Sequence, residues 1–382
     1  RIARRQRQMC IRDRPNLDVS GASQGCVDVA NFLSEKNYNS YILTHSGPKS
    51  IEVKDSNEKV FYAPVNSKNP LKIFLNIIKI IQLIKKLNIT IVHARSRAPA
   101  WSSYFACAVT GAKFITTFHG TYNFSNPLKK YYNSIMLKTN GTIAISEFIN
   151  DHINNCYQTK NNNIRTIARG VDLDFFDPNN CKTQQVELII KEFNIDNDAI
   201  KILLAGRITG WKGHKLLLQA ISSILKKTNH KFEIIFVGPD ENHKLKTSLK
   251  NFANEHNLAK SLHFVGPRND LNNFYSLADL VISASTDPEA FGRISVEAQA
   301  MGKFVIASNH GGSVETVKDG ETGYLFENNN SEDLCEKIID AISYEKHKSD
   351  KTSEACISHV REKYSKIKMC EETINFYEEV IN

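Results

Sequence analysis

Two glutamates, Glu289 and Glu297, have seven residues between them and stand where a strand-like run passes into a helical pattern. The run covers residues 280–285, and the helical pattern begins at about Phe291. We therefore expect Glu289 in the loop at the carboxyl end of a strand and Glu297 about two turns inside the next helix. A helix N-terminus favours a phosphate. With one carboxylate for sugar hydroxyls and one for ribose hydroxyls, the stretch indicates a nucleotide-sugar site.

The same stretch, taken alone, also fits an ordinary helix cap with one solvated glutamate. A second loop favours the nucleotide-sugar interpretation. Arg207 and Lys212 follow the strand-like run 201–205, where a helix is about to begin. Two cations beside a helix N-terminus can hold a diphosphate. Solvated surface cations are the alternative for these two residues.

Glycines end several of the predicted strands. A pair of them, in the segment 310–315 after the run 304–307, allows another backbone to approach closely. Others follow strands that should share one rim of the sheet, where a base can stack against backbone. Together with the aromatic residue and the glycine that open the Glu297 helix, the predicted contact residues are Gly206, Gly238, Gly266, Phe291, Gly292, Gly311 and Gly312.

Short apolar runs alternate with longer helical patterns along the whole chain. This alternation predicts parallel sheets covered by helices on both faces. The polar stretch 174–185 is the best linker, so we expect two α/β domains that meet near residues 175–195, with ligands at the carboxyl ends of strands, in the cleft between them. The predicted strands are 41–44, 90–94, 113–117, 142–145, 164–167, 201–205, 232–237, 262–265, 280–283, 304–307 and 324–326.

Charge is distributed unevenly over the 382 residues. The net charge of +8 divides into +12 for residues 1–190 and −4 for residues 191–382. A basic first half fits an acidic acceptor or an anionic membrane surface, and simple solvation is the alternative. We expect no nucleic-acid partner, since no recognised binding motif is present and the aromatic residues are typical of a core. The eight scattered cysteines lack zinc spacing and indicate free thiols in a reducing cytoplasm.

The most apolar segment, residues 71–87, is interrupted by four lysines and is too broken to span a bilayer. Its apolar residues recur at helical spacing, which predicts an amphipathic helix packed on a sheet. An interfacial membrane helix is the alternative. The apolar residues that carry the pattern are Leu71, Phe74, Ile77, Ile78, Ile81 and Ile84.

The segment 1–14 differs from the rest of the chain. It contains six arginines, begins without methionine and shows no strand-like periodicity. We expect a fragment, a cloning scar or foreign sequence joined to a truncated reading frame. On that interpretation the first domain would lack a strand.

The motifs of the second half together resemble the retaining glycosyltransferases of family 4 (group 1), which have the GT-B fold. The resemblance extends over about residues 15–382, and its motifs are spaced and ordered as in that family. The matching residues are Gly206, Arg207, Lys212 and Gly213 in G-R-x5-K-G, Glu289 and Glu297 in E-x7-E, and Gly311, Gly312 and Glu315 in GG-x-x-E.

The first half supports the resemblance through segments that end predicted strands, among them the one containing His119 and one in which Ser146 should cap a helix. The family's glycine loop is represented by Gly21, although Ser20 replaces the first glycine. The family's usual proline is Ala168 here. His93 is assigned to structure.

The resemblance implies the fold and the roles. We expect two Rossmann-like, doubly wound α/β domains that face each other across a cleft: residues 15–180 for the acceptor and 190–365 for the donor, with 366–382 as a helix crossing back to the first domain. Lys212 and Arg207 would neutralise the leaving diphosphate. Glu297 would accept the ribose hydroxyls, Glu289 would align the sugar, and His119 and Gly21 would act from the first domain.

The implied activity is retaining transfer of a sugar from a UDP- or GDP-type donor to a glycan or lipid-linked saccharide, in polysaccharide or lipopolysaccharide synthesis. No cofactor and no metal are expected. The protein is expected in the cytoplasm, or peripheral on the inner face of the cytoplasmic membrane. The alternatives are a sugar-nucleotide epimerase on the same fold and a non-catalytic nucleotide-sugar binding protein.

Overall fold

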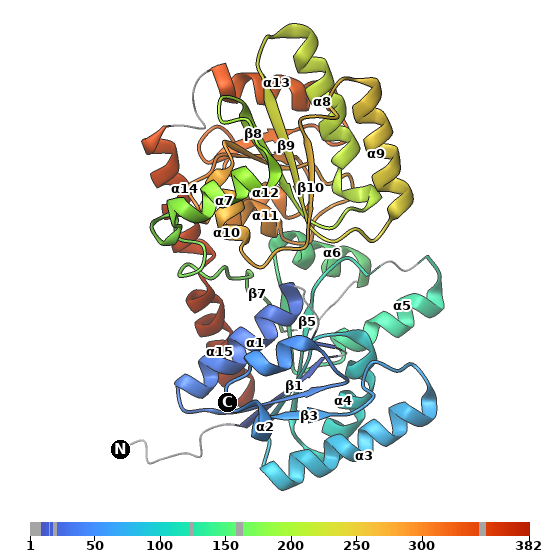
Figure 1. Cartoon of the computed structure of the whole chain (residues 1–382). Coiled ribbons are helices and arrows are strands. Elements are labelled where there is room, and N and C mark those ends of the chain that lie inside the picture. The colour runs from blue at the N-terminus through green and yellow to red at the C-terminus, as the bar shows by residue number, and fades with distance from the viewer. Residues whose placement is uncertain (1–8, 15, 18–20, 123–124, 158–162, 344–348) are drawn as a thin grey trace. The chain divides into compact units, whose positions relative to one another are not determined.

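Parallel pairing between short strands organises the chain, which we describe from a computed structural model. The structure describes residues 9–14, 16–17, 21–122, 125–157, 163–343 and 349–382. These fall into two compact units (Figure 1). Unit 1 contains the described residues up to Gly170 together with Lys366–Asn382, and unit 2 contains those of Val171–Ser365.

Unit 1 is built on a seven-stranded parallel sheet in the order β3-β2-β1-β4-β5-β6-β7. Its inner strands are buried on both faces, as expected for a parallel sheet covered by helices. The order reverses between β1 and β4, which is the topological switch point of a doubly wound fold. The strands are β1 (Met9–Arg14), β2 (Asn39–Thr44), β3 (Val60–Tyr62), β4 (Ile91–Ala94), β5 (Lys113–Phe118), β6 (Gly141–Ala144) and β7 (Ile164–Thr166).

Strand β1 corrects the expectation for the arginine-rich segment. Residues Met9–Arg14 pair in parallel with β2 on one side and with β4 on the other, so the segment supplies a central strand. Pairing along both edges satisfies the backbone of a central strand and can override a weak local pattern. Residues 1–8 and Ser20 of the glycine loop lie outside the described residues.

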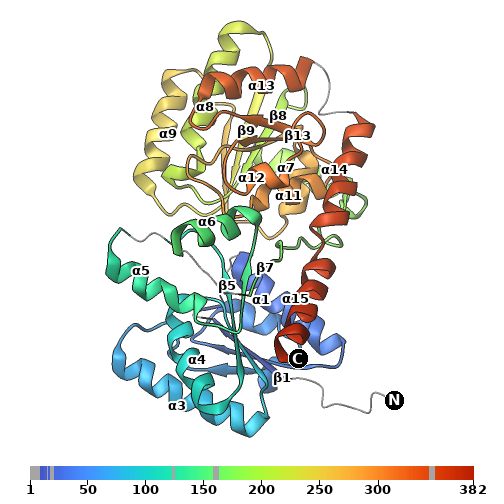
Figure 2. The ribbon, with the colours of Figure 1, turned by 180° about the vertical axis from the view of Figure 1, so that it is seen from behind.

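Helices cover both faces of the unit 1 sheet. The apolar sides of α1 and α15 form one core with the strands, and α3 and α4 lie side by side on the other face (Figures 1 and 2). The helices are α1 (Gly21–Glu35), η1 (Pro48–Glu52), α2 (Ser56–Lys59), α3 (Pro70–Leu87), α4 (Arg97–Thr110), α5 (Pro127–Ser134), η2 (Ile135–Leu137), α6 (Glu147–Tyr157) and α15 (Lys366–Ile381).

Helix α3 forms as predicted, but its apolar residues do not pack as predicted. Asn69 caps its N-terminus by accepting hydrogen bonds from two backbone N–H groups, and Pro70 occupies the first turn. The buried residues are Asn76, Ile80, Leu83 and Ile84. Of the residues expected to face the sheet, Leu71, Phe74 and Ile78 are exposed and only Ile84 is buried. The interpretation of this stripe as a core face was therefore wrong.

The last helix, α15, belongs to unit 1. His93 of β4 forms hydrogen bonds through both ring nitrogens. Its Nδ1 lies 2.6 Å from the hydroxyl oxygen of Tyr377 in α15, and its Nε2 lies 2.7 Å from Oγ1 of Thr117. His93 is fully buried between these two hydroxyls, which confirms its structural role. Glu378 accepts a hydrogen bond from Tyr38 at 2.8 Å.

Unit 2 carries a six-stranded parallel sheet in the order β10-β9-β8-β11-β12-β13. Apolar residues of α8, α9 and α13 form the main core against it. Three strands to one side of a reversal and three to the other reproduce the dinucleotide-binding arrangement, with the switch point between β8 and β11. The strands are β8 (Ile200–Ala205), β9 (Phe232–Val237), β10 (Leu262–Gly266), β11 (Leu280–Ser283), β12 (Val305–Ser308) and β13 (Gly323–Phe326).

The helices of unit 2 begin earlier in the chain than the expected linker suggests. The units separate between Gly170 and Val171, and Phe176 is buried inside unit 2 with its ring against Tyr275. The helices are η3 (Pro178–Asn180), α7 (Thr183–Phe193), η4 (Gly210–Lys212), α8 (His214–Lys227), α9 (His243–Glu255), α10 (Leu271–Leu277), α11 (Arg293–Ala300), α12 (Ser313–Thr316), α13 (Ser331–Ser343) and α14 (Asp350–Lys363).

All eleven strands predicted from the sequence are present, and the α/β class with two parallel sheets is confirmed. The sequence pattern did not predict β1 or the three-residue β3. The seven cysteines whose side chains are described are free thiols, as expected. Within the described residues, no helix is both long and apolar enough to span a membrane.

Candidate functional site

The two loops that flank the unit 2 switch point are joined by an ion pair. Lys212 lies at the end of η4, after β8, and Glu289 lies in the loop after β11. Nζ of Lys212 pairs directly with Oε1 of Glu289, and the two side chains are only 11% and 14% exposed. Ser285 donates a further hydrogen bond of 2.6 Å to the same oxygen. The structure thus brings the predicted cation and the predicted sugar-binding carboxylate together.

Backbone contacts hold these loops in register. Gly213 has a φ of 74°, and a Cβ atom there would lie 1.8 Å from the carbonyl oxygen of Ala284. The N–H of Thr286 donates to the carbonyl oxygen of Trp211 at 2.7 Å. Nζ of Lys212 also lies 4.4 Å from the Trp211 ring centroid, within cation–π range. Gly213 is needed because the backbone here lies against the segment that follows β11. This close backbone contact sets the position of the neighbouring Lys212.

Glu297 is the fifth residue of α11 and stands at the start of its second turn. The helix begins at Arg293, so Glu297 is about one turn from the N-terminus and not two, as the sequence suggested. Its side chain is 5% exposed. Nε of Arg293 donates to Oε1 at 2.6 Å, and the hydroxyl of Tyr275 donates to Oε2 at 3.0 Å. Each carboxylate oxygen thus has one fixed donor.

Tyr275 and Ser285 have a place in the site that sequence reasoning did not assign. Burial raises the pKa of the Tyr275 phenol well above its usual value, and the charge of Glu297 raises it further, so the hydroxyl stays protonated and donates. Arg293 could have been found from its i, i+4 spacing to Glu297. Tyr275 lies on another helix, α10, and has no comparable signal in the sequence.

Arg207 is directed elsewhere. Its Nη1 lies 3.2 Å from Oε2 of Glu241, and both side chains are about half exposed. Arg207 and Lys212 thus follow the same strand, but the structure pairs them with different carboxylates. The structure therefore separates the two cations that were expected to act together.

Glycines form one edge beside the switch point. Gly206, Gly238 and Gly266 stand at the ends of the neighbouring strands β8, β9 and β10. The N–H of Gly238 donates to the carbonyl oxygen of Gly266 at 2.9 Å. A Cβ on Gly238, whose φ is 152°, would lie 2.1 Å from the carbonyl oxygen of Gly206. The expected common rim is present.

The paired glycines after β12 approach protein backbone. Gly312 donates its N–H to the carbonyl oxygen of Glu289 at 2.7 Å. Gly311 has a φ of 60°, and a Cβ there would lie 2.6 Å from the same oxygen. The ring of Phe291 is buried against Tyr364, and Gly292 precedes α11 with a φ of 85°. These residues hold the Glu289 loop in place.

The candidate residues of unit 1 are held by their own contacts. Nδ1 of His119, in the loop after β5, lies 2.9 Å from Nη2 of Arg169. Ser146 accepts a 3.1 Å hydrogen bond from the N–H of Ile149 and so caps α6, as predicted. Gly21 is the first residue of α1.

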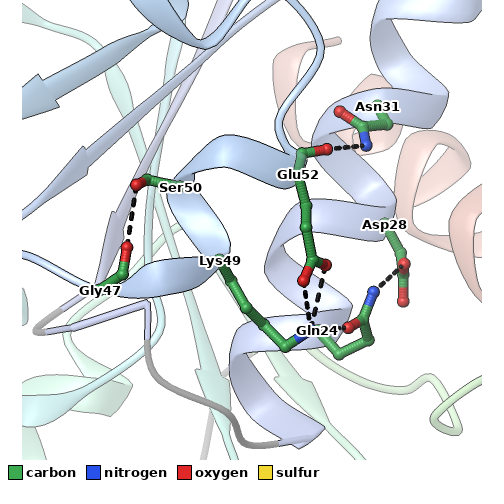
Figure 3. Close-up of polar contacts among 7 residues, drawn as sticks. All are labelled: Gln24, Asp28, Asn31, Gly47, Lys49, Ser50 and Glu52. Carbon is green, nitrogen blue, oxygen red and sulfur yellow. Dashed lines mark hydrogen bonds and ion pairs between the residues drawn. The ribbon is translucent and has the colours of Figure 1, made fainter. Parts of the chain in front are cut away.

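A polar cluster fastens α1 to the segment after β2 (Figure 3). Lys49 donates to Gln24 at 2.5 Å and to both carboxylate oxygens of Glu52, and Gln24 donates to Asp28 at 2.9 Å. Asn31 donates to the carbonyl oxygen of Glu52 at 2.9 Å. These contacts fix the helix that Gly21 opens.

Metal ligands do not gather in the part of the chain that the structure describes: it contains no group of three or more His, Cys, Asp or Glu side chains that could hold an ion. The charged side chains near the switch point include Lys212 and Arg293, which pair with Glu289 and Glu297.

Comparisons with known proteins place both halves of the chain in one group. Residues 185–362 match the family model for group 1 glycosyl transferases, and residues 19–175 match that for glycosyltransferase family 4. A crystal structure of a glycosyltransferase from Rickettsia africae is 37% identical to this chain, with a TM-score of 0.90, and the match covers 99% of this chain and all of that one.

Two further relatives are more distant or shorter matches. The lipopolysaccharide 1,2-N-acetylglucosaminetransferase of Salmonella typhimurium is 36% identical over 46% of this chain and 47% of that enzyme, so the match spans about half its length. The crystal structure of Anabaena HepE in complex with UDP and glucose has a TM-score of 0.83 at 16% identity, covers 97% of this chain and 99% of that one, and shows the likeness of fold.

Proposed function

The chain belongs to the group 1 glycosyltransferases of family 4, and on that premise we propose that it transfers a sugar from a nucleoside diphosphate sugar to a saccharide acceptor. The observation that carries the proposal is the enclosed Lys212–Glu289 pair at the switch point of unit 2, one loop away from Glu297. A cation, a sugar-orienting carboxylate and a second carboxylate for a diol are what such a donor requires.

Lys212 would stabilise the leaving diphosphate. As the bond between the anomeric carbon and the phosphate oxygen breaks, negative charge grows on that oxygen, and a cation fixed beforehand lowers the barrier. In the structure Lys212 pairs with Glu289, and both side chains are mostly buried. A bound donor would share Lys212 between phosphate and Glu289, whose carboxylate could also accept sugar hydroxyls. Arg207 would add to the grip after exchanging Glu241 for phosphate.

Glu297 would accept the two ribose hydroxyls. A charged, almost fully buried carboxylate with one donor on each oxygen retains lone pairs for further hydrogen bonds. At the glycine edge Gly206 and Gly266 are half-buried and Gly238 is buried, and a base could stack against the backbone that stays accessible there. The solved complexes of Anabaena HepE with UDP and with UDP-glucose support a uridine donor as the first to test, with GDP next.

Transfer with retention of configuration is proposed from the family resemblance. The acceptor oxygen would attack the anomeric carbon on the face that the diphosphate leaves, and the acceptor proton would pass to the leaving phosphate oxygen. His119, held by Arg169, is proposed to contact the donor sugar from unit 1. Protein cations would do the electrostatic work, so we propose that no metal is needed.

A bacterial surface saccharide is the proposed acceptor class. The Salmonella relative is named for a lipopolysaccharide substrate, which supports a glycan or lipid-linked acceptor here. The basic first half of the chain, with a net charge of +12 over residues 1–190, supports attachment to the anionic inner face of the cytoplasmic membrane.

The test is nucleotide binding followed by turnover. A ligand that binds only the folded protein raises its melting temperature, so we expect a rise with UDP or GDP and less with ADP. Lys212→Ala should remove the rise and reduce donor turnover at least about 100-fold. Lys215→Ala, which removes an exposed lysine of α8, is the matched control. Full activity in Lys212→Ala would contradict the proposal.

The products of a donor-only incubation separate the alternatives. Slow release of nucleoside diphosphate and free sugar is expected of a transferase with an open acceptor site. Isomerised sugar would indicate an epimerase, and binding without turnover would indicate a non-catalytic protein. Addition of EDTA should leave the rate unchanged, and a large loss would show that a metal takes part.

A further inference from the structure

Helix α3 carries apolar residues on two opposite sides, and only one of them is buried. With about 100° per residue, the buried residues Asn76, Ile80, Leu83 and Ile84 centre on one side of the helix. Leu71, Phe74, Leu75 and Ile78 form a second stripe about 180° away, with the i, i+3, i+4, i+7 spacing of a continuous surface. Their exposed fractions are 68%, 58%, 53% and 40%. We call this second stripe the α3 face.

The charges beside the α3 face all have one sign. The helix contains four lysines and no acidic residue. Lys72 and Lys79 border the apolar stripe, and Lys85 and Lys86 follow it in the last turn, all four exposed. Such a combination of exposed apolar side chains and cations, without compensating carboxylates, is typical of a helix that lies on an anionic lipid surface.

Neighbouring helices of unit 1 also carry exposed apolar side chains. Helix α4 packs against α3, with Ser102 donating to the carbonyl oxygen of Ile73 at 3.3 Å, and the two helices lie side by side in Figures 1 and 2. Trp101 of α4 contacts the Tyr131 ring of α5 at 5.8 Å. The exposed apolar residues on α4 and α5 are Phe105, Val109, Leu128 and Tyr131. The exposed apolar area is therefore not confined to one helix.

We propose that the α3 face is the surface by which this protein docks on an anionic bilayer. Leu71, Phe74, Leu75 and Ile78 enter the boundary between headgroups and acyl chains, and the lysines contact lipid phosphates. This inference deepens the proposed membrane attachment by assigning it a surface. It does not depend on the donor chemistry of unit 2.

Charge argues against a second copy of the chain as the occupant. A symmetric dimer would set the same patch against itself, so the lysines of both copies would meet across an apolar contact. Repulsion between the lysines of the two copies would oppose association, whereas anionic lipids would neutralise these charges.

Topology gives the docked helix a useful direction. Helix α3 crosses from the carboxyl end of β3 to the amino end of β4. Its first turns therefore lie on the side of the sheet where the parallel strands have their carboxyl ends, and the His119 loop, which follows β5, lies on the same side. The apolar stripe occupies those first turns, and Lys85 and Lys86 lie at the far end. Docking by this stripe brings the candidate acceptor-side loops of unit 1 towards the lipid surface, where a lipid-linked saccharide would be presented.

Sedimentation with vesicles tests the proposal on the full chain. We expect binding to phosphatidylcholine vesicles that contain about 30% phosphatidylglycerol as the anionic lipid. Little binding is expected to vesicles of phosphatidylcholine alone. Phe74→Ser/Leu75→Ser should lower the partition coefficient at least about tenfold, since both side chains lose their apolar contact. Leu188→Ser, at an equally exposed leucine of α7 in unit 2, should leave it unchanged.

A second pair of variants tests the charge. Lys72→Gln/Lys79→Gln should weaken binding roughly twentyfold at low salt, whereas Lys226→Gln/Lys227→Gln in the last turn of α8 should have little effect. In a Phe74→Trp variant the emission maximum of the added tryptophan should shift to shorter wavelength when anionic vesicles are present.

Three results would overturn the proposal: no binding of the wild type to anionic vesicles, equal binding of the α3-face variants, or a wild-type dimer that those variants convert to a monomer. The last result would identify a second copy as the occupant. Nucleotide-induced melting shifts should persist in every one of these variants. If the wild type bound anionic vesicles but showed no nucleotide-induced melting shift, the proposed donor function would be contradicted and the proposed membrane surface would not.

Discussion

At the scale of single residues, the site depends on charges that are held away from water. Lys212 and Glu289 are mostly buried and neutralise each other, so removing either one leaves an uncompensated charge as well as a missing contact. Glu297 is held differently, by the exposed Arg293 on one oxygen and by the buried Tyr275 on the other. Tyr275 is therefore a positioning residue for Glu297.

Tyr275→Phe should raise the donor KM several-fold and change kcat less, because the carboxylate that would receive the ribose loses its fixed donor while Lys212 stays in place. Steady-state kinetics with varied donor concentration measures this division. Tyr38→Phe is a matched control, since it also removes a tyrosine–glutamate hydrogen bond, but in unit 1. An unchanged donor KM in Tyr275→Phe would contradict the assigned role.

At the scale of elements, the start of α8 connects the loop bearing Lys212 to the sheet. Gly213 is the last residue before the helix and touches the backbone that follows β11, and His214 is the first residue of the helix. The His214 ring is buried and stands edge-on to Phe236 at 4.7 Å. Strain or charge introduced here would move the loop and the helix together.

Gly213→Ala should reduce both stability and activity. The new Cβ would collide with the Ala284 carbonyl, and the residue would also have to keep a positive φ, so we expect a loss of at least about 1–2 kcal/mol and a displaced Lys212. Gly210→Ala is the control, because a Cβ there meets nothing within 4 Å. Urea unfolding and donor turnover report the two effects, and equal behaviour of both variants would refute the argument.

Acid should destabilise unit 2 through His214. Burial, and then the charge of Lys212, lower the pKa of this imidazole to about 4, from an ordinary 6.5. The unfolded chain therefore takes up the proton first, and stability present above pH 6.5 is lost as the pH falls towards 4, by about 3 kcal/mol in total. Urea unfolding of the wild type at several pH values measures this slope. His214→Phe should flatten it, whereas the exposed His230→Gln should not.

At the scale of the whole molecule, residues from the chain's end complete unit 1. Helix α15 buries Phe376 against β6, where Gly141 leaves the necessary space, since a Cβ there would lie 2.6 Å from the ring. Arg165 and Glu379 pair 2.5 Å apart across 214 residues of sequence. The candidate residues for the diphosphate and the ribose, in contrast, all come from unit 2.

Phe376→Ala should therefore loosen unit 1 and spare the donor residues. We expect a loss of about 3–5 kcal/mol from the cavity, faster amide hydrogen exchange in β4–β7, and unchanged exchange in β8–β13. The response to nucleotide should remain. Ile367→Ala, at an exposed position of the same helix, controls for truncation alone. Equal loosening of both units would show that α15 does not act within unit 1 only.

The sequence by itself determined the alternation of strands and helices and the positions of the candidate loops. Buried parallel strands require apolar runs of limited length, and loops near a switch point require particular glycines and charges, so both leave marks that can be read locally. On this ground Glu289 and Lys212 were each placed in the loop after the correct strand, and Glu297 in the helix that follows β11. These local marks are also why the family could be identified from motif spacing.

Only the tertiary structure decided which partners those residues have. Lys212 pairs with Glu289 while Arg207 pairs with Glu241, and Tyr275 reaches Glu297 from another helix, because contacts between distant segments depend on how the elements pack. The same reason explains β1, which two neighbouring strands stabilise despite its weak pattern. It also explains α3: periodicity predicts an apolar stripe, but packing decides which of its two apolar sides the sheet covers.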